Sequence, residues 1–318
     1  MERDRKFTAR HDGPLLESLM EMCEGESRTK VKSYLTHGQI MVNDRNITAF
    51  DHQLKKGDSI VILARGTRLK RHSGETDTRV RIVYEDDWLI VAEKKSGLLT
   101  ISTGAGGETT AYSILTEHVR RQAARKAGSR AAAKKTGVYI VHRIDRDTSG
   151  LIIFAKDLQT RERLQENWNR SVISRKYVAV LEGTLPQEEG TWTSWLKENP
   201  KSLKVSSSPT DNGGKMAVTH YHELLRAPKY SLAEFELETG RKNQIRVHAA
   251  DMGCPIAGDK KYGARSNPLG RLALHARSIA FIHPVTGRTV SFDTGIPRMF
   301  RRMFSDSEVL PKESGAGH

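Results

Sequence analysis

Residues 138–155 read VYIVHRIDRDTSGLIIFA, two short apolar runs around a polar segment that ends in a glycine. Runs rich in β-branched residues and bounded by a glycine turn predict two strands joined by a turn. A turn at the end of a strand is exposed, and scaffolds often present reactive side chains there. The segment His142–Gly150, which contains the carboxylates Asp145 and Asp147, is therefore the first candidate for a functional site.

Similar β-rich runs recur at residues 88–92 and 177–181, and Ala233–Glu238 alternates apolar with acidic residues as a half-buried strand does. Helical patterns lie irregularly between these runs, for example over Asp157–Arg170. Because regular strand–helix–strand alternation is absent, the sequence predicts an α+β fold rather than a doubly wound parallel sheet. We expect a largely antiparallel mixed β-sheet flanked by helices and loops.

Composition excludes several classes of protein. A length of 318 residues suggests two domains, and 37% hydrophobic with 28% charged residues is typical of a globular chain. No run approaches the ~18 apolar residues of a membrane span, so we expect no membrane association. The polar start shows no secretory signal, and two distant cysteines exclude a disulfide framework and a cysteine zinc site. We therefore predict a cytoplasmic protein, and a monomer by default.

The formal net charge of +14 indicates a polyanionic partner, most often nucleic acid, although a merely soluble basic protein is the alternative. Residues 1–66 hold 11 Lys/Arg against 10 Asp/Glu, so nearly all of the excess lies beyond them. Seven Lys/Arg and no acidic residue lie between Val119 and Thr136. Three interpretations of this segment remain open: a basic helix, a flexible arm that orders on RNA, and a solvated surface insertion.

Four regions follow from these patterns. Residues 14–66 form a small α/β module, 67–78 a linker without apolar periodicity, 79–304 a larger domain, and 305–318 a disordered tail. Within the module we expect one helix near Leu15–Met20 and a second over Thr29–Thr36, with Ser27 as its N-cap and Gly38 as its C-cap. Short strands are expected at residues 39–42, 47–48 and 59–63.

The module resembles the small RNA-binding domain of ribosomal small-subunit protein S-four. The resemblance rests on residues 27–32, 37–43 and 54–58, which read SRTKVK, HGQIMVN and LKKGD. In that family the basic helix and the following turn grip structured RNA, which implies RNA binding by Arg28, Lys30 and Lys32. Arg28 and Lys32 are four apart and share a helix face. The alternative is that these charges form an ordinary solvated surface.

Two metal interpretations of the larger domain fail on spacing. Asp145, Asp147 and Ser149–Gly150 match the opening of a calcium loop, but the position that needs glutamate is Lys156. The histidines do not form a metal-type helical pair such as HExxH. We therefore predict no metal site.

The larger domain resembles an RluA-type RNA pseudouridine synthase over about residues 83–284. The hallmark HRLDxxTSG appears as HRIDRDTSG at His142–Gly150, and KxYxA as RKYVA at Arg175–Ala179. TGRxxQIRVH appears at Thr239–His248, GDxxYG at Gly258–Gly263, and the early LxVxxKPxG motif at Leu89–Gly97.

Two positions depart from the family pattern. Lys95 replaces the usual proline of the early motif, which predicts a looser turn. Asn243 replaces a frequent histidine, and its amide should still donate and accept hydrogen bonds.

This resemblance implies a function and a set of site residues. The family isomerises uridine within RNA to pseudouridine, a redox-neutral reaction for which no cofactor is expected. Asp145 is the implied catalytic carboxylate, which either attacks the sugar or assists loss of its proton. Arg246 would keep that carboxylate ionised, Tyr177 would stack on the base, Arg143 would help to displace the uridine, and Ile245 would pack nearby. For Arg246 a phosphate contact or surface ion pair, and for Tyr177 a core position, are the alternatives.

The expected substrate is large-subunit ribosomal RNA, because of the appended S-four-type domain, with tRNA second. A non-catalytic RNA-binding factor in ribosome assembly is the alternative of another class. A simple glycosidase is disfavoured, because that chemistry usually needs two carboxylates and only Asp145 lies in a supported motif position.

Overall fold

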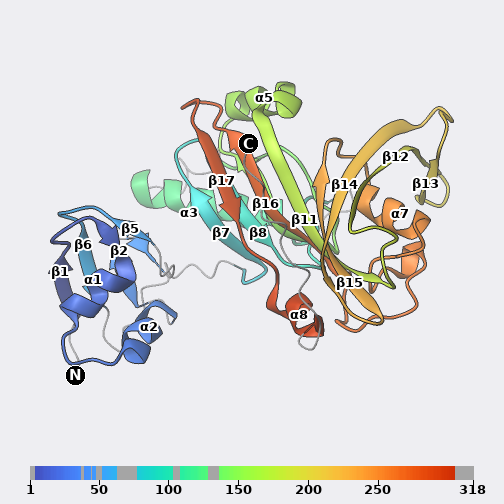
Figure 1. Cartoon of the computed structure of the whole chain (residues 1–318). Coiled ribbons are helices and arrows are strands. Elements are labelled where there is room, and N and C mark those ends of the chain that lie inside the picture. Colours follow the sequence, from blue (N-terminus) through green and yellow to red (C-terminus); the bar gives the residue numbers. More distant parts are fainter. Residues whose placement is uncertain are drawn as a thin grey trace, which may run out of the picture. The chain divides into compact units, whose positions relative to one another are not determined.

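The computed structural model describes residues 4–36, 39–43, 45–47, 52–62, 77–102, 108–127 and 136–304. The chain divides into two compact units, residues 1–75 and 76–318 (Figure 1). The predicted tail and most of the predicted linker lie outside the described residues, so the domain boundaries stay predictions.

In the part of the chain that the structure describes, no helix is both long and apolar enough to cross a bilayer.

The first unit packs two helices against a small antiparallel sheet. Buried side chains of the helices, such as Leu19 and Leu35, form one core with Ile40 and Ile60 of the sheet. The sheet order is β1-β6-β3-β4, and β2 pairs with β5 beside it. The elements are β1 (Arg5–Thr8), β2 (Gly13–Pro14), α1 (Leu15–Met22), α2 (Arg28–Thr36), β3 (Ile40–Val42), β4 (Arg45–Asn46), β5 (Gln53–Leu54) and β6 (Ser59–Ile62).

Helix α2 begins as the sequence predicts. The Ser27 hydroxyl accepts a hydrogen bond from the backbone N–H of Lys30 at 3.3 Å, which satisfies one of the free donors at the helix start. The predicted C-cap, Gly38, lies outside the described residues.

One strand prediction in this unit is wrong, and three strands were missed. The sequence places a strand at residues 47–48, but β4 is Arg45–Asn46, and residue 48 is not described. Asn43 adopts a left-handed backbone with φ 47°, and its side chain bonds to Asp58 and to the N–H of Ser59. This turn closes the hairpin early, so β4 starts two residues sooner. The missed strands are short: β1 has four residues and lies at the sheet edge, and β2 and β5 have two residues each and pair with one another.

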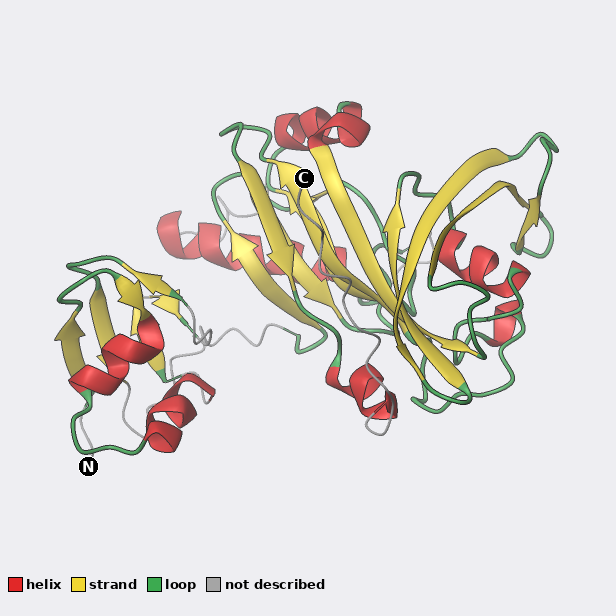
Figure 2. Cartoon of the chain, viewed as in Figure 1, coloured by secondary structure: helices red, strands yellow, loops and turns green. Residues whose placement is uncertain are grey.

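The second unit is built on an 11-stranded sheet (Figure 2). Its order is β13-β12-β14-β15-β11-β16-β10-β8-β7, with β17 on β16 and β9 on β10. All of these pairs are antiparallel except β10 with β16, which confirms the predicted α+β class. The strands are β7 (Val80–Glu85), β8 (Leu89–Lys94), β9 (Tyr139–Ile140), β10 (Ser149–Ala155), β11 (Val172–Glu182), β12 (Glu189–Glu198), β13 (Val205–Ser208), β14 (Lys215–Arg226), β15 (Tyr230–Leu237), β16 (Leu274–Ile282) and β17 (Thr289–Asp293).

Helices pack against the sheet in several places. The apolar side of α3 packs on β7, β8 and β10 through residues such as Leu115, and α7 lies against β13 and β14. The helices are α3 (Ala111–Ala127), α5 (Leu158–Glu166), α6 (Trp168–Ser171), α7 (Gln244–Asp251) and α8 (Arg298–Arg301), with 3₁₀ turns η1 (Lys260–Tyr262) and η2 (Arg302–Phe304). The basic segment after Val119 is therefore helical to residue 127, and residues 128–135 are not described.

The helix predicted over Asp157–Arg170 is two helices. Asp157 caps α5 by accepting from the N–H of Thr160 at 2.7 Å, and Asn167 separates α5 from α6. Strand β11 starts directly after α6, so the break sets where this long strand begins.

Gly150, directly after the polar turn of residues 142–149, allows the start of β10 to pack closely against β16. Its φ is +117°, and a Cβ there would lie 2.2 Å from the carbonyl oxygen of Ala276 on β16. Only glycine fits this backbone and this close approach. The parallel contact between β10 and β16 therefore depends on this residue.

Candidate active site

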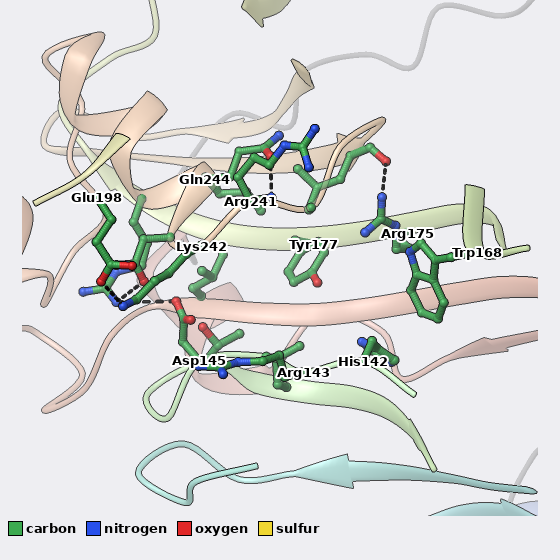
Figure 3. A pocket seen from close by; sticks show the side chains of 18 of the residues that line it. His142, Arg143, Asp145, Trp168, Arg175, Tyr177, Glu198, Arg241, Lys242 and Gln244 are labelled. Atoms are coloured by element: carbon green, nitrogen blue, oxygen red, sulfur yellow. Dashed lines mark hydrogen bonds and ion pairs between the residues drawn. The ribbon is translucent and has the colours of Figure 1, made fainter. Parts of the chain in front are cut away.

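Three segments converge on a cavity of about 610 Å³ (Figure 3). They are the polar turn before β10, strand β11, and the turn that leads into α7. All five residues that the sequence predicts for catalysis and substrate binding line this cavity, namely Arg143, Asp145, Tyr177, Ile245 and Arg246. Their side chains range from exposed, at Arg143, to buried, at Ile245.

Asp145 and Arg246 form an ion pair in the lining of the cavity. Asp145 Oδ2 lies 3.5 Å from Nη1 of Arg246, and the two side chains are 28% and 11% exposed. Asp259 binds the same guanidinium from behind, with Nε–Oδ2 at 2.7 Å and Nη2–Oδ1 at 2.8 Å. Burial works against the charge of Arg246, but the two carboxylates outweigh it and raise its pKa. The arginine stays charged and aims one nitrogen at Asp145.

Asn243 and Tyr262 complete the support of this arginine. Asn243 Oδ1 accepts from Arg246 Nη1 at 3.1 Å, and Nδ2 donates to the Tyr262 hydroxyl at 3.0 Å. The guanidinium also lies over the Tyr262 ring, 5.0 Å from its centroid. The prediction that asparagine still donates and accepts at this position is confirmed.

Sequence reasoning missed Asp259 as a site residue. Its side chain is 1% exposed and pairs with Arg246. The signal was available, because Asp259 is the acidic residue of the GDKKYG segment at residues 258–263. The GDxxYG motif alone does not show that this carboxylate pairs with Arg246.

The side chain of Lys94 supports the polar turn through hydrogen bonds to backbone carbonyls. Sequence reasoning missed this residue as well. The side chain is fully buried, and its ammonium group donates to the carbonyl oxygens of Leu98 and Thr148 at 2.7 Å and of Arg146 at 2.9 Å. Burial lowers the pKa of Lys94 to about 7. Its hydrogen bonds fix the backbone that carries Asp145.

Three hydrogen bonds hold the turn after Lys94, and its expected looseness relative to the family pattern stays a prediction. The backbone N–H of Lys95 donates to the Arg79 carbonyl at 2.8 Å, a bond that proline cannot make. The Ser96 hydroxyl donates to the Asp147 carbonyl at 2.6 Å, and the N–H of Gly97 donates to that of Arg146 at 2.9 Å. Each of these bonds ties the turn to a neighbouring segment of the chain.

Tyr177 lies in the middle of the cavity, between Asp145 and Arg175 (Figure 3). Burial raises the pKa of its phenol, Arg175 opposes this, and Asp145 adds to it. The hydroxyl is therefore protonated at neutral pH, and its aromatic ring forms part of the cavity wall.

His142, Trp168 and Arg175 form the other end of the cavity. The His142 ring lies 4.9 Å from that of Trp168, and its Nε2 accepts the N–H of Ile153 at 3.1 Å. Burial lowers the pKa of His142 to about 3, so the ring is neutral. Arg175 lies 5.7 Å from the centroid of Trp168 and donates to the carbonyl of Leu237 at 3.2 Å. Trp168 lies within the helix predicted over Asp157–Arg170, and no motif in the sequence marks it as a site residue.

Within the described ranges, no group of three or more His, Cys, Asp and Glu residues is placed to bind a metal ion.

Residues 88–251, which contain the polar turn and the start of α7, match the model of the RNA pseudouridylate synthase family. The chain belongs to this family. The match confirms the predicted resemblance to the RluA-type synthases over the larger domain and identifies the protein as an RNA pseudouridine synthase, an isomerase.

Similar proteins span most of the length of this synthase. An uncharacterized RNA pseudouridine synthase of Bacillus subtilis is 31% identical over 91% of each chain. Ribosomal large subunit pseudouridine synthase D of Neisseria meningitidis is 32% identical over 93% of this chain and 78% of its own. The structure of human RNA pseudouridylate synthase domain containing 1 covers 76% of this chain and 93% of its own, with TM-score 0.57 and 20% identity, and shares the fold.

Proposed function

We propose that this synthase converts uridine in large-subunit ribosomal RNA to pseudouridine, with Asp145 as the catalytic carboxylate. The observation that carries the site assignment is the Asp145–Arg246 pair at 3.5 Å inside the cavity of Figure 3. The choice of RNA is supported by similar proteins named as ribosomal large subunit synthases, from Neisseria meningitidis and Vibrio cholerae. tRNA is the second choice.

Each proposed role follows from the position of the side chain. The target uridine leaves its stack and enters the cavity, where the Tyr177 ring stacks on the base and Ile245 packs against it. Asp145 then attacks the sugar or assists loss of its proton, and the charged Arg246 favours the ionised carboxylate that either step needs. Arg143 is exposed at the cavity and helps to displace the uridine. Because the isomerisation is redox-neutral and transfers no external group, we propose that it needs no cofactor.

The other carboxylate that lines the cavity, Glu198, forms an ion pair with Lys242. That pairing does not favour a second catalytic carboxylate of the kind that glycosidases use.

The test is Asp145→Asn, with Asp147→Asn as the matched control. Asp147 belongs to the same motif, but its side chain is 43% exposed and pairs with Arg146. Large-subunit ribosomal RNA and bulk tRNA transcripts are incubated with each protein, and pseudouridine is mapped chemically. We expect wild type and Asp147→Asn to modify ribosomal RNA and Asp145→Asn to modify nothing. Full activity of Asp145→Asn would overturn the site assignment, and modification of tRNA alone would overturn the choice of RNA.

We also propose that the first unit is an S-four-type domain that binds RNA through α2. Arg28, Lys30 and Lys32 are exposed on this helix, and Lys30 lies 3.7 Å from Glu26. They form a local cationic surface in residues 1–66, which are nearly neutral overall, with 11 Lys/Arg against 10 Asp/Glu.

The double variant Arg28→Ala with Lys32→Ala tests this role. Each lost phosphate contact lowers the slope of log affinity against log salt by about 0.7–0.9, so the pair should lower it by roughly 1.4–1.8. The rate on a short saturating RNA should not change. Lys55→Ala with Lys56→Ala, which removes two exposed charges from another turn of the unit, is the control. Equal slopes for both double variants would contradict a specific contact by α2.

We propose that the enzyme acts in the cytoplasm. Its cysteines, Cys23 and Cys254, are both free and buried, which suits a reducing compartment, and the similar proteins from Bacillus subtilis and Neisseria meningitidis are bacterial.

A further inference from the structure

A second cavity of about 520 Å³ adjoins the site. It shares Trp168, Asn169, Arg175 and Leu237 with the cavity that holds Asp145, so these residues form a common wall. The two cavities are therefore neighbouring compartments of one groove. Figure 3 shows Trp168 and Arg175 at the end of the site away from Lys242 and Glu198.

Trp168 is held in place although it is only half-buried. His142 lies 4.9 Å from its ring centroid at a tilt of 40°, and the guanidinium of Arg175 lies 5.7 Å from it. Arg175 is itself fixed by the carbonyl oxygens of Leu237 and Glu238, at 3.2 and 3.3 Å. An indole that is fixed by neighbours and still borders two cavities is a preorganised stacking surface.

The second compartment suits a base rather than a phosphate. Two carboxylates line it, Glu236 and Glu238. Glu236 Oε1 accepts from the Ser174 hydroxyl, and Glu238 Oε1 bonds to His220 at 2.6 Å. For the other oxygen of each carboxylate, no bond to a described side chain is found. These acceptors repel phosphate and attract the exocyclic amino group of a base.

We propose that this compartment binds the base of a nucleotide next to the target uridine, stacked on Trp168 and read through its exocyclic amino group. Adenine, cytosine or guanine fits, and uracil, which presents a carbonyl there, does not. The inference rests on the proposal that the target uridine occupies the cavity of Asp145. It makes Trp168 a substrate-binding residue that contributes to the choice of site.

A double-mutant cycle, in which Trp168 of the protein and the neighbouring base of the RNA are changed separately and together, tests whether the two stack. A short RNA that contains the mapped uridine is made with its 5′ or its 3′ neighbour intact or abasic, and kcat/KM is measured for wild type, Trp168→Phe and Trp168→Leu. For wild type, the intact-to-abasic ratio at one flank should be about 5- to 150-fold, the range for one base–aromatic stack. The ratio should fall close to one in Trp168→Leu, which keeps an apolar side chain, and be intermediate in Trp168→Phe.

The ratio separates binding from folding, because a protein with less active material loses rate on both RNAs equally. A wild-type ratio near one at both flanks, or the same ratio in all three proteins, would overturn the inference. Failure of the proposed function looks different, because wild type would then form no pseudouridine at all.

A second series tests the carboxylates at the flank that shows the effect. Cytosine and uracil are compared there, since they differ in the amino group and the carbonyl at carbon four. Wild type should prefer cytosine by about 2- to 12-fold, as expected for one hydrogen bond. Glu236→Gln with Glu238→Gln, whose amides also donate, should remove the preference. A wild type that accepts both bases equally or prefers uracil would refute the role of the amino group.

Discussion

Replacement of Asp259 by asparagine separates the positioning of Arg246 from its charge. The carboxylate is 1% exposed and makes two hydrogen bonds to the guanidinium, at 2.7 and 2.8 Å. An asparagine of the same shape accepts only one of them and points its NH₂ at the other donor. Arg246 keeps its charge and loses the group that holds it 3.5 Å from Asp145. We expect the freed arginine to move closer to Asp145 and to displace that carboxylate, which is the proposed catalytic group.

The magnitude follows from the burial of the pair. Loss of one partner of a buried ion pair costs about 3–5 kcal/mol of unfolding free energy. For a domain of this size each kcal/mol shifts the melting temperature by roughly 2–4 °C, so the expected fall is roughly 6–20 °C. A displacement of about 1 Å at the reacting groups can cost ~10²-fold in rate, and we expect a loss of that order in kcat/KM.

The assay reports on the relevant unit alone, because all four tryptophans, at positions 88, 168, 192 and 195, lie in the second unit. Thermal unfolding is followed by tryptophan fluorescence, and kcat/KM is measured below the transition. Asp87→Asn, at an exposed position of the same unit, is the control and should match wild type. An unchanged melting temperature would refute the energetic reasoning. A destabilised but fully active Asp259→Asn would refute its positioning role.

Two further predictions concern buried groups of the second unit. Lys94→Met should lower the free energy of unfolding, measured with urea, by roughly 2–6 kcal/mol, because the carbonyls of Leu98 and Thr148 each lose a hydrogen-bond donor at a cost of ~1–3 kcal/mol. The control is Lys95→Met at the exposed neighbouring position, which should change the free energy of unfolding little. A midpoint for Lys94→Met equal to that of Lys95→Met would contradict this. Burial lowers the pKa of His142 to about 3 and those of His248 and His275 to about 4 from 6.5, so the unfolded chain binds more protons between pH 6.5 and 4. The stabilisation from these three neutral histidines is fully present above pH 6.5, and the free energy of unfolding should fall as the pH drops, by up to about 4 kcal/mol per pH unit. A urea midpoint that stays constant from pH 7 to 5 would contradict this prediction.

Local signals in the sequence were enough for much of the fold. The period-two pattern of residues 233–238 corresponds to β15, and Ser27 caps α2 as predicted. Errors arose where a single side chain ends an element. Asn167 splits the helix predicted over Asp157–Arg170, and the left-handed Asn43 shifts β4. Both depend on backbone angles that the pattern of apolar residues does not encode.

The sequence by itself determined the class of the protein and five of the side chains that line the cavity. The polar turn of residues 142–150, the tyrosine at 177 and the arginine at 246 lie in motifs that local order suffices to reveal. Only the tertiary structure decided how they meet. Asp145 and Arg246 are 101 positions apart and come together because Gly150 lets β10 touch β16 and because Asp259 anchors the arginine. Such distances are set by the packing of segments that are far apart in the sequence. Burial in that packing also sets the charge state of each group. A local sequence pattern encodes neither the distances nor the burial.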